Sequence, residues 1–337
     1  MNYVKEKKNI KMSVKDKIIT LTYGDCAENH VGMQQLGEKE DRGFSLDELK
    51  KLCVKMKKNG ANCEIIILND YLSDELKKKV DYIGVVLILR NGIDFLFGEE
   101  GIKERMYVEQ NSLEWNKKYW DNRRKKVLNK IKRWNLCYDN FEQKSDLENG
   151  KGSVVHFDRV PLTKKLRELI GGMLGKSGEN LRCEGNNYYD IKSGKCGIGW
   201  HGDKERSKVV GVRLGVSGSL CYVWCNDGEE VSDRIKINLE GGDIYVMSEK
   251  SVGNDWLSRK KITLRHGMET VEGKILKKIT KKKKKDENHV DFILEMLKKE
   301  SLEDVRDFYK NIEDEDKVNN MSKEEIIKEY KHLFSKV

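Results

Sequence analysis

The sequence lacks several features that would place it in a membrane or outside the cell. No apolar stretch approaches the roughly 20 residues that a membrane-spanning helix needs, so no contact with a membrane is expected. The N-terminal residues MNYVKEKKNIKM are charged and include no apolar core of a signal peptide, so secretion is not expected either. Internal repeats are also absent. These absences favour a soluble protein of a cytosolic-type compartment.

Cysteine spacing excludes two further classes. The chain has eight cysteines: Cys26, Cys53, Cys63, Cys137, Cys183, Cys196, Cys221 and Cys225. No pair has the spacing of a zinc knuckle, and without a secretory leader a disulfide framework is not expected. We therefore predict reduced thiols buried in the core.

Length and charge leave the number of domains and the partners open. The 337 residues suffice for one large or two modest domains with a real core. The formal charge of +9 comes from 66 basic and 57 acidic residues, and part of the excess lies in the run Lys281–Lys285. Such mild basicity permits a nucleic-acid partner through phosphate contacts, but a lysine-rich solvated surface explains it equally well. Nothing in the sequence fixes the oligomeric state.

The first half of the chain has an α/β pattern. Residues 1–16 form a lysine-rich lead-in that we expect to be disordered, and residues 17–150 are predicted to form an accessory domain. Apolar runs predict strands over residues 18–23, 63–68 and 83–89, and Ser45 can cap a helix that ends at Gly60. The basic, aromatic stretch 110–134 is predicted to be a helix that docks its aromatic face on a neighbour.

The second half changes to short strands. A polar stretch at residues 143–152 is the best boundary, and the only proline, Pro161, precedes a predicted helix over residues 162–174. Five predicted strands follow, with the sequences VVGVRLG, LCYVWC, RIKINL, DIYVMS and KITLRH. Strands at this spacing indicate a β-sandwich or barrel-like double sheet over residues 151–273. Residues 274–337 are predicted to be a lysine-rich linker and a helical extension, with amphipathic segments at residues 292–297 and 326–333.

His201 and Asp203 are the residues with the clearest chemical meaning. On an extended strand, side chains two positions apart leave the same face, so this imidazole and this carboxylate can reach one metal ion together. Two histidines and one carboxylate on one face of a metal leave three positions open, as non-haem Fe(II) oxygenases require. A lone H-x-D pattern is common by chance, so its surroundings must decide.

Those surroundings resemble the AlkB-like branch of the Fe(II)/2-oxoglutarate dioxygenases over residues 180–270. Asn187 and Tyr189 form N-x-Y upstream of IGWHGDKE, and the strands VGVRLG, GDIYVMS and RKKITLRHG follow. The strings YGDCAENHVGMQ and NLCYDNFEQ extend a closer resemblance, to uncharacterised AlkB-like proteins of large DNA viruses and microbial eukaryotes, over residues 18–270. The resemblance implies an α+β protein with a double-stranded β-helix (jelly-roll) oxygenase core, Fe(II) and 2-oxoglutarate as cofactors, and a role for Asn187 and Tyr189 in holding 2-oxoglutarate.

The resemblance leaves the third metal ligand open between two alignments. His266 is the default, because His289 and His332 lie in the predicted helical tail. In the other alignment Arg259 and Arg265 match the strand pattern R-x-N-x-T-x-R, and Asp255 would be the only nearby substitute ligand. We favour His266, since imidazole is the commoner partner of Fe(II) in such triads.

The residue that binds the distal carboxylate of 2-oxoglutarate is correspondingly open. A planar guanidinium matches a carboxylate in two parallel hydrogen bonds, so Arg259 and Arg265 are better candidates than a lysine. The alternatives are Lys274, Lys277 and Lys278, whereas a structural role is assigned to Arg213.

The residues Glu28, Asn29 and His30 follow a predicted strand and would suit a polar pocket, although turn hydrogen bonds account for them as well.

The resemblance implies oxidation of a substrate C–H bond, and the first candidate substrate is a nucleobase in DNA or RNA that is demethylated or hydroxylated. A protein side chain or a small molecule is the second candidate, because one fold supports many activities. A binding module without a metal is the third. If the protein is viral, we expect it in the cytoplasm or nucleus of the host cell.

Overall fold

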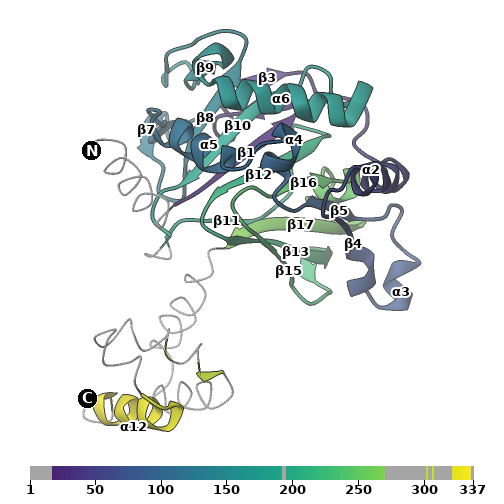
Figure 1. Ribbon diagram of the computed structural model, residues 1–337, viewed down its shortest axis with the longest axis vertical. Helices are drawn as coiled ribbons and strands as arrows, with labels where there is room; N and C mark the ends of the chain where they lie inside the picture. Colours follow the sequence, from purple (N-terminus) through teal and green to yellow (C-terminus); the bar gives the residue numbers. More distant parts are fainter. Residues whose placement is uncertain (1–16, 192–194, 270–300, 303–305, 307–320, 335–337) are drawn as a thin grey trace. The chain divides into compact units, whose positions relative to one another are not determined.

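The computed structural model describes residues 17–191, 195–269, 301–302, 306 and 321–334 (Figure 1). It divides into one unit over Met1–Lys274 and another over Ile275–Val337. In the second unit, helix α12 (Lys323–Phe334) confirms the predicted amphipathic segment near the C-terminus. The predictions for residues 1–16, Lys281–Lys285, residues 292–297 and the three alternative lysines at 274, 277 and 278 lie outside the described residues.

An eight-stranded sheet forms the centre of the first unit. Its order is β4-β5-β16-β12-β1-β10-β8-β9, and all neighbours are antiparallel except the parallel pair β8 and β9. The strands are β1 (Ile18–Gly24), β4 (Cys63–Ile67), β5 (Val85–Leu89), β8 (Trp134–Asp139), β9 (Val154–His156), β10 (Arg182–Tyr188), β12 (Val209–Gly215) and β16 (Ile244–Met247). We call it the major sheet.

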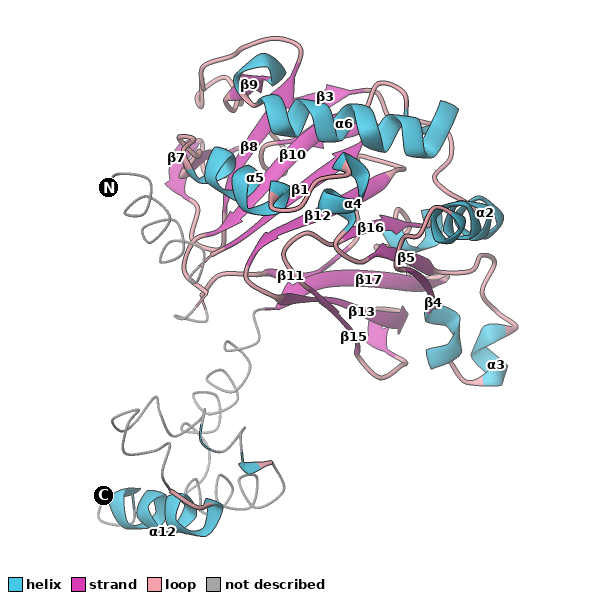
Figure 2. Ribbon diagram, viewed as in Figure 1, coloured by secondary structure: helices cyan, strands magenta, loops and turns pink. Residues whose placement is uncertain are grey.

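A second sheet of five strands, the minor sheet, lies beside the major sheet (Figure 2). Its path is β11-β17-β13-β14, and β15 also pairs with β13. The strands are β11 (Ile198–His201), β13 (Gly218–Asn226), β14 (Glu229–Glu230), β15 (Ile235–Leu239) and β17 (Ile262–Glu269).

Because side chains alternate along each strand, one face of the major sheet packs against helices and the other faces a cavity. In β1, Ile19, Leu21 and Tyr23 belong to the main hydrophobic cluster, which they share with helices packed on that face. Thr20 and Thr22 point the other way and line a cavity. The covering helices are α2 (Leu46–Lys58), α4 (Gly92–Phe97), α5 (Ile102–Asn111) and α6 (Pro161–Leu174) (Figure 2).

The remaining elements are short. They are the ribbon β2 (Cys26–Glu28) with β3 (Gln35–Gly37), the ribbon β6 (Lys118–Asp121) with β7 (Lys126–Asn129), helices α3 (Asp74–Lys77) and α7 (Glu249–Val252), and the 3-10 turns η2 (Leu68–Tyr71), η3 (Phe157–Arg159) and η4 (Gly175–Gly178).

Much of the predicted secondary structure is confirmed. Every strand predicted from an apolar run is present, and Ser45 caps α2 through a capping box with Glu48. All eight cysteines are buried and free. The described chain is α+β with two large antiparallel sheets, and none of its helices is both long and apolar enough to cross a bilayer.

The boundary predicted near residue 150 does not separate two units. Strand β1, from the predicted accessory domain, lies between β10 and β12 from the predicted oxygenase core. Strands β4, β5 and β8 join the same sheet from the N-terminal side. The prediction of a separate domain over residues 17–150 failed because strand pairing between distant segments leaves no local sequence signal.

The helix predicted over residues 110–134 is also wrong beyond Asn111. Helix α5 ends at Asn111, and the rest forms the hairpin β6–β7 and the start of β8. Lys125, in the hairpin turn, has a φ of 50°, which a helix does not allow. Tyr119 and Trp120 are adjacent, so they point to opposite faces of β6 instead of sharing a helical stripe.

Candidate metal centre

A cavity of about 330 Å³ lies between the two sheets, and we call it the chamber. Strands β1, β10 and β12 of the major sheet and β11, β13 and β17 of the minor sheet contribute to its wall. The two sheets contribute different side chains to the chamber. The minor sheet provides His201 and His266, which are possible metal ligands, and the major sheet provides Arg213.

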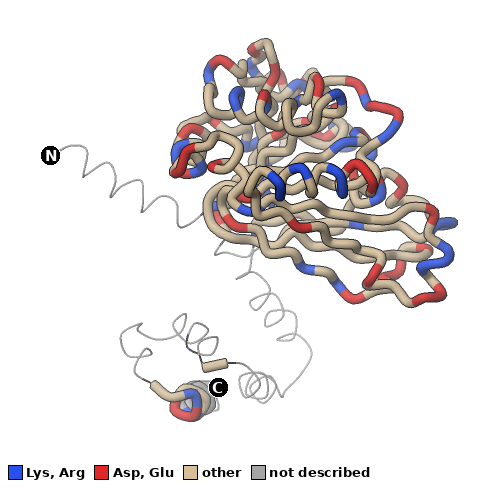
Figure 3. The backbone as a smooth tube through the Cα atoms, turned by 45° about the vertical axis from the view of Figure 1, so that its right-hand side comes forward, with Lys and Arg blue, Asp and Glu red and all other residues tan. Residues whose placement is uncertain are grey.

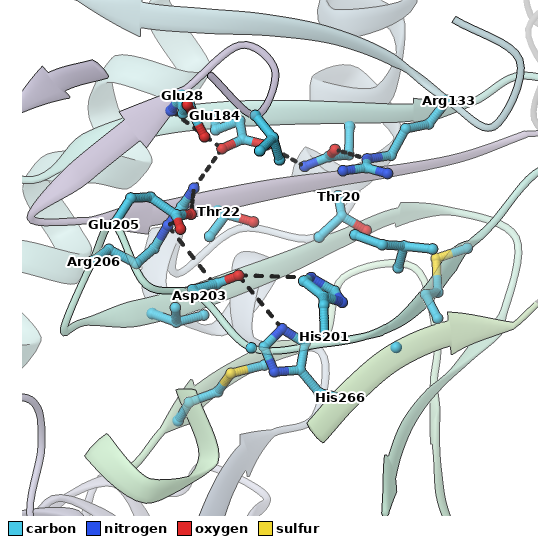
Figure 4. Close-up of a pocket in the computed structure, with 18 of the residues that line it drawn as sticks. Thr20, Thr22, Glu28, Arg133, Glu184, His201, Asp203, Glu205, Arg206 and His266 are labelled. Carbon is cyan, nitrogen blue, oxygen red and sulfur yellow. Dashed lines mark hydrogen bonds and ion pairs between the residues drawn. The ribbon is translucent and has the colours of Figure 1, made fainter. Parts of the chain in front are cut away.

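His201, Asp203 and His266 converge on one point of the chamber wall (Figure 4). Asp203 Oδ1 lies 3.6 Å from Nε2 of His201 and 3.7 Å from Nε2 of His266. The side chains are 25%, 15% and 7% exposed in sequence order. One ligand atom from each residue lies within 4.8 Å of the others, so the three side chains could hold a metal ion.

Strand pairing and one close backbone approach produce this convergence. His201 and His266 are direct cross-strand partners in β11 and β17. The chain then turns at Gly202, where a Cβ atom would lie 2.1 Å from the carbonyl oxygen of Gly253. The backbone N–H of Asp203 donates to the carbonyl of Val252 at 3.0 Å, which fixes the carboxylate next to the two rings. Gly202 is therefore required by packing.

The surroundings of the two imidazoles affect which nitrogen can face a metal and whether the ring is protonated. Nδ1 of His201 lies 2.8 Å from the carbonyl oxygen of Gly199, a contact that leaves Nε2 facing the cluster when Nδ1 carries the proton. Burial, together with the neighbouring His201, holds the pKa of His266 well below its usual range, so this ring is neutral near pH 7.

Arg206 connects Asp203 to a second buried carboxylate, Glu184 on β10 (Figure 4). Its Nη2 donates to Glu184 Oε2 at 2.6 Å, and its Nε lies 3.8 Å from Asp203 Oδ2. The guanidinium is 4% exposed, and Glu205 accepts a further bond from it at 3.0 Å. Arg206 therefore restrains the outer oxygen of Asp203 and leaves Oδ1 turned toward the histidines.

We expect Arg206→Gln to weaken metal binding by about 10- to 100-fold, the usual effect of removing a group that orients a ligand. The measurement is a Mn(II) or Fe(II) titration of purified protein under argon. Lys208→Gln is the matched control, because Lys208 is also a buried cation but pairs with Glu40 outside the chamber. Equal metal affinity in Arg206→Gln and the wild type would show that Arg206 has no part in the site.

Arg213 on β12 lies in the chamber, although the sequence analysis interpreted it as a structural residue. It is 1% exposed, lines the chamber, and faces Thr20 across the strands, with Asn186 next in the same row. Its Nη1 contacts Met268 Sδ at 3.3 Å, and its buried Nε has no hydrogen-bond partner among the described residues. No carboxylate forms an ion pair with it in that part of the chain, and burial lowers its pKa. A buried guanidinium without a counter-ion has the charge and the free donor to bind an anion.

The two arginines predicted to bind 2-oxoglutarate do not reach the chamber. Arg259 is exposed in the turn before β17. Arg265 precedes His266 on a regular strand and so points to the opposite face, and it does not line the chamber. The alternative ligand Asp255 is held by Lys250 at 2.8 Å. Of the two alignments considered, the geometry favours the one that makes His266 the third ligand.

The predicted N-x-Y pair is displaced by one residue. Asn186 and Tyr188 line the chamber, whereas Asn187 and Tyr189 belong to the alternate positions of the strand. Asn187 pairs with Ile19, which faces the helices, and Tyr189 stacks on Trp134 at 4.0 Å. The sequence NNYY offers two overlapping N-x-Y patterns, and only the strand pairing shows which one faces the chamber.

The loop that begins at Glu28 does contribute to the chamber, as one of the two interpretations of the sequence proposed. Glu28, Asn29, His30 and Val31 line its wall. Burial raises the pKa of Glu28 to about 7, even though the backbone N–H of Gly32 donates to it at 2.8 Å. Burial also lowers the pKa of His30 to about 4, so this ring is neutral at physiological pH.

Comparison with known proteins gives one relative and no family model that matches the chain. "Uncharacterized protein R156" of Acanthamoeba polyphaga mimivirus is 40% identical over 248 residues, which are 74% of this chain and 94% of that protein. The chain belongs to the family of this mimivirus protein. Because the name of the mimivirus protein states no activity, the function proposed for this chain rests on the geometry of the chamber.

Proposed function

We propose that the protein is an Fe(II)- and 2-oxoglutarate-dependent dioxygenase of the AlkB-like type. The convergence of His201, Asp203 and His266 in the chamber carries the proposal. The two opposed antiparallel sheets are compatible with the double-stranded β-helix expected of such an enzyme.

The donor set fits iron. Two imidazole nitrogens and one carboxylate oxygen, 3.6–3.7 Å apart along the His–Asp edges, can all bond one ion at the usual distance of about 2.0–2.2 Å. Two histidines and one carboxylate leave other positions of an octahedral ion free, which distinguishes an oxygenase site from a closed structural zinc site.

Arg213 suits the distal carboxylate of 2-oxoglutarate better than the arginines suggested by sequence alignment. Its guanidinium is buried in the same chamber and lacks an ion-pair partner among the described residues. Thr20, beside it in the sheet, has a buried hydroxyl without a hydrogen-bond partner in the described chain, and Tyr188 also lines the wall. A carboxylate bound here would satisfy Arg213 and Thr20 together.

When bound, Fe(II) with 2-oxoglutarate and O2 supplies the oxidation of a substrate C–H bond, with succinate and CO2 as co-products. The chain's residues hold and orient the reactants. The triad presents one nitrogen or oxygen atom from each side chain, Arg206 restrains Asp203, and the apolar parts of Leu220, Met247 and Met268 limit the water in the chamber.

For the substrate, we propose a nucleobase in DNA or RNA that is demethylated or hydroxylated. The support is a chamber of about 330 Å³ beside a strongly basic hairpin with aromatic residues. A protein side chain or a small molecule is the second candidate, because a pocket of this size accepts either.

The substrate test is succinate release from 2-oxoglutarate, measured with methylated single-stranded oligonucleotides, with the same oligonucleotides unmethylated, and with peptide pools. We expect methylated oligonucleotides to raise succinate release several-fold above the rate without substrate. Stimulation by peptides alone would overturn the nucleobase proposal and favour a protein hydroxylase.

A further inference from the structure

Residues 115–133, which include the hairpin β6–β7, have a strong local excess of positive charge. Residues 115–133 include nine of the 66 basic residues but one of the 57 acidic residues, so the rest of the chain is close to neutral. Over most of the other described residues of the first unit, basic and acidic residues are mixed along the backbone, and the lysines of α2 form another basic run (Figure 3). Such a concentration is an electrostatic footprint for a polyanion.

Part of this positive charge is exposed to solvent, whereas Lys130 is 6% exposed and donates to Asn29 and Asn135. Arg123, Lys125 and Lys126 are exposed at the hairpin turn, whereas Arg124 pairs with Asp121 at 3.7 Å. Exposed Val127 and Ile131 accompany them at 37% and 64% exposure. Like charges held together on a short hairpin repel each other, and an anionic partner relieves that repulsion.

The hairpin is attached directly to the wall of the chamber. The ring of Tyr119 stacks on His30 with 3.8 Å between centroids, and Asn122 Nδ2 donates to the carbonyl of Gly32 at 2.7 Å. His30 lines the chamber, and so does Arg133 at the other end of the basic segment. The cations therefore lie beside the chamber.

A second cavity, of about 530 Å³, lies on the other side of the same loop, and we call it the groove. Glu28–Val31 line the chamber and Gly32–Gln34 line the groove, so one loop forms a wall of both. The hairpin contributes Trp120 and Lys125 to the groove. An aromatic ring and a cation together in an open groove suit a base and its phosphate.

We propose that the groove and the hairpin β6–β7 bind single-stranded nucleic acid next to the nucleotide that enters the chamber. The inference rests on the proposed nucleobase substrate and adds the surface that holds the rest of the strand. Trp120 provides a stacking face for a neighbouring base, and Arg123, Lys125 and Lys126 contact phosphates. A duplex would keep its bases stacked on each other, which is why we commit to a single strand.

The test is binding of a fluorescein-labelled, unmodified DNA oligonucleotide of mixed sequence to the full chain, followed by fluorescence anisotropy at several salt concentrations. For the triple variant Arg123→Gln, Lys125→Gln, Lys126→Gln we expect affinity to fall at least about 10-fold. The slope of log affinity against log salt should decrease by about 2, since each phosphate contact on a single strand contributes about 0.7. For Trp120→Ala we expect a loss of about 5- to 100-fold that persists at high salt.

The matched control neutralises three exposed lysines of α2, with Lys51→Gln, Lys55→Gln and Lys58→Gln. It should bind DNA within about 2-fold of the wild type. Equal losses in the two triple variants would overturn the assignment, because the effect would then follow net charge alone. If poly-glutamate competes as strongly as unlabelled DNA, the partner is an acidic protein and the assignment is overturned. Tighter binding of a duplex than of the single strand would also overturn it.

The DNA-binding test of the hairpin can be judged separately from the metal-binding test of the chamber. Weakened DNA binding by the hairpin variant, in a protein whose chamber binds no metal, would support the surface and reject the oxygenase. Normal metal binding with unchanged DNA affinity in the hairpin variant would reject the surface and leave the oxygenase standing.

Discussion

Alanine in place of His266 is expected to abolish tight metal binding, with a loss of affinity greater than about 100-fold. Removal of an outer residue that only orients a ligand already weakens binding by about 10- to 100-fold, and loss of the ligand itself removes more. His266 is 7% exposed and its Nε2 faces Asp203, so no other described side chain can replace it without rearrangement. The measurement is metal content after loading with Fe(II) under argon, together with a Mn(II) titration.

His30→Ala is the matched control. His30 is a histidine of the same chamber, but it stacks on Tyr119 and is not part of the cluster of possible ligands. It should keep one metal per chain. If His30→Ala and His266→Ala lose metal equally, the cluster of His201, Asp203 and His266 is not the metal site.

Arg213→Met is expected to raise the dissociation constant of 2-oxoglutarate at least about 30-fold without lowering the stability of the protein. Removal of one partner of a buried, hydrogen-bonded charge pair costs about 2 kcal/mol or more of binding. In the free protein the guanidinium is 1% exposed and has no ion-pair partner among the described residues, so methionine removes a desolvated charge from the core. Calorimetric titration with 2-oxoglutarate and thermal unfolding give the two readings.

Arg265→Met is the control, and it decides between two assignments. Arg265 is next to His266 in sequence but points away from the chamber, and alignment with the AlkB-like pattern makes it the carboxylate anchor. We expect 2-oxoglutarate affinity within about 2-fold of the wild type for this variant. The reverse result, with affinity lost in Arg265→Met and kept in Arg213→Met, would contradict the anchor proposed here. A large loss of stability in Arg213→Met would indicate a structural role for that residue.

The sequence identified the residues whose spacing itself has a geometric consequence. His201 and Asp203, two positions apart after a strand, could be paired because side chains alternate with a period of two. His266 followed from the scarcity of histidines outside the tail and from the short strand that carries it. Capping of α2 by Ser45 could be predicted because the interaction is local.

Arg213 could not be found in this way, because nothing local distinguishes a buried arginine without a partner from one in an ion pair. The decisive facts are its position on a central strand and the lack of an ion-pair partner among the described residues, and both depend on strands β1 and β17, which are distant in sequence. The displacement of the N-x-Y pair has a related cause. In NNYY each of the two alternating sets of side chains contains one asparagine and one tyrosine. Only the pairing of Asn187 with Ile19 shows which set faces the helices.

The basic hairpin was mistaken for a helix because its aromatic residues can fit a helical stripe as well as two strands. Trp115, Tyr119 and Trp134 lie at positions compatible with a helix, but they end on three different elements or connections. Its closeness to the chamber depends on the stack between Tyr119 and His30, residues 89 positions apart in the sequence.

The most direct test of the account is a calorimetric titration of the wild-type protein with 2-oxoglutarate under argon, with and without Mn(II) in place of the reactive iron. If the triad and Arg213 act on one ligand in one chamber, 2-oxoglutarate should bind with a stoichiometry of one when the metal is present and at least about 10-fold more weakly when it is removed by chelation. Equal affinity with and without metal, or no binding in either case, would contradict the proposed site.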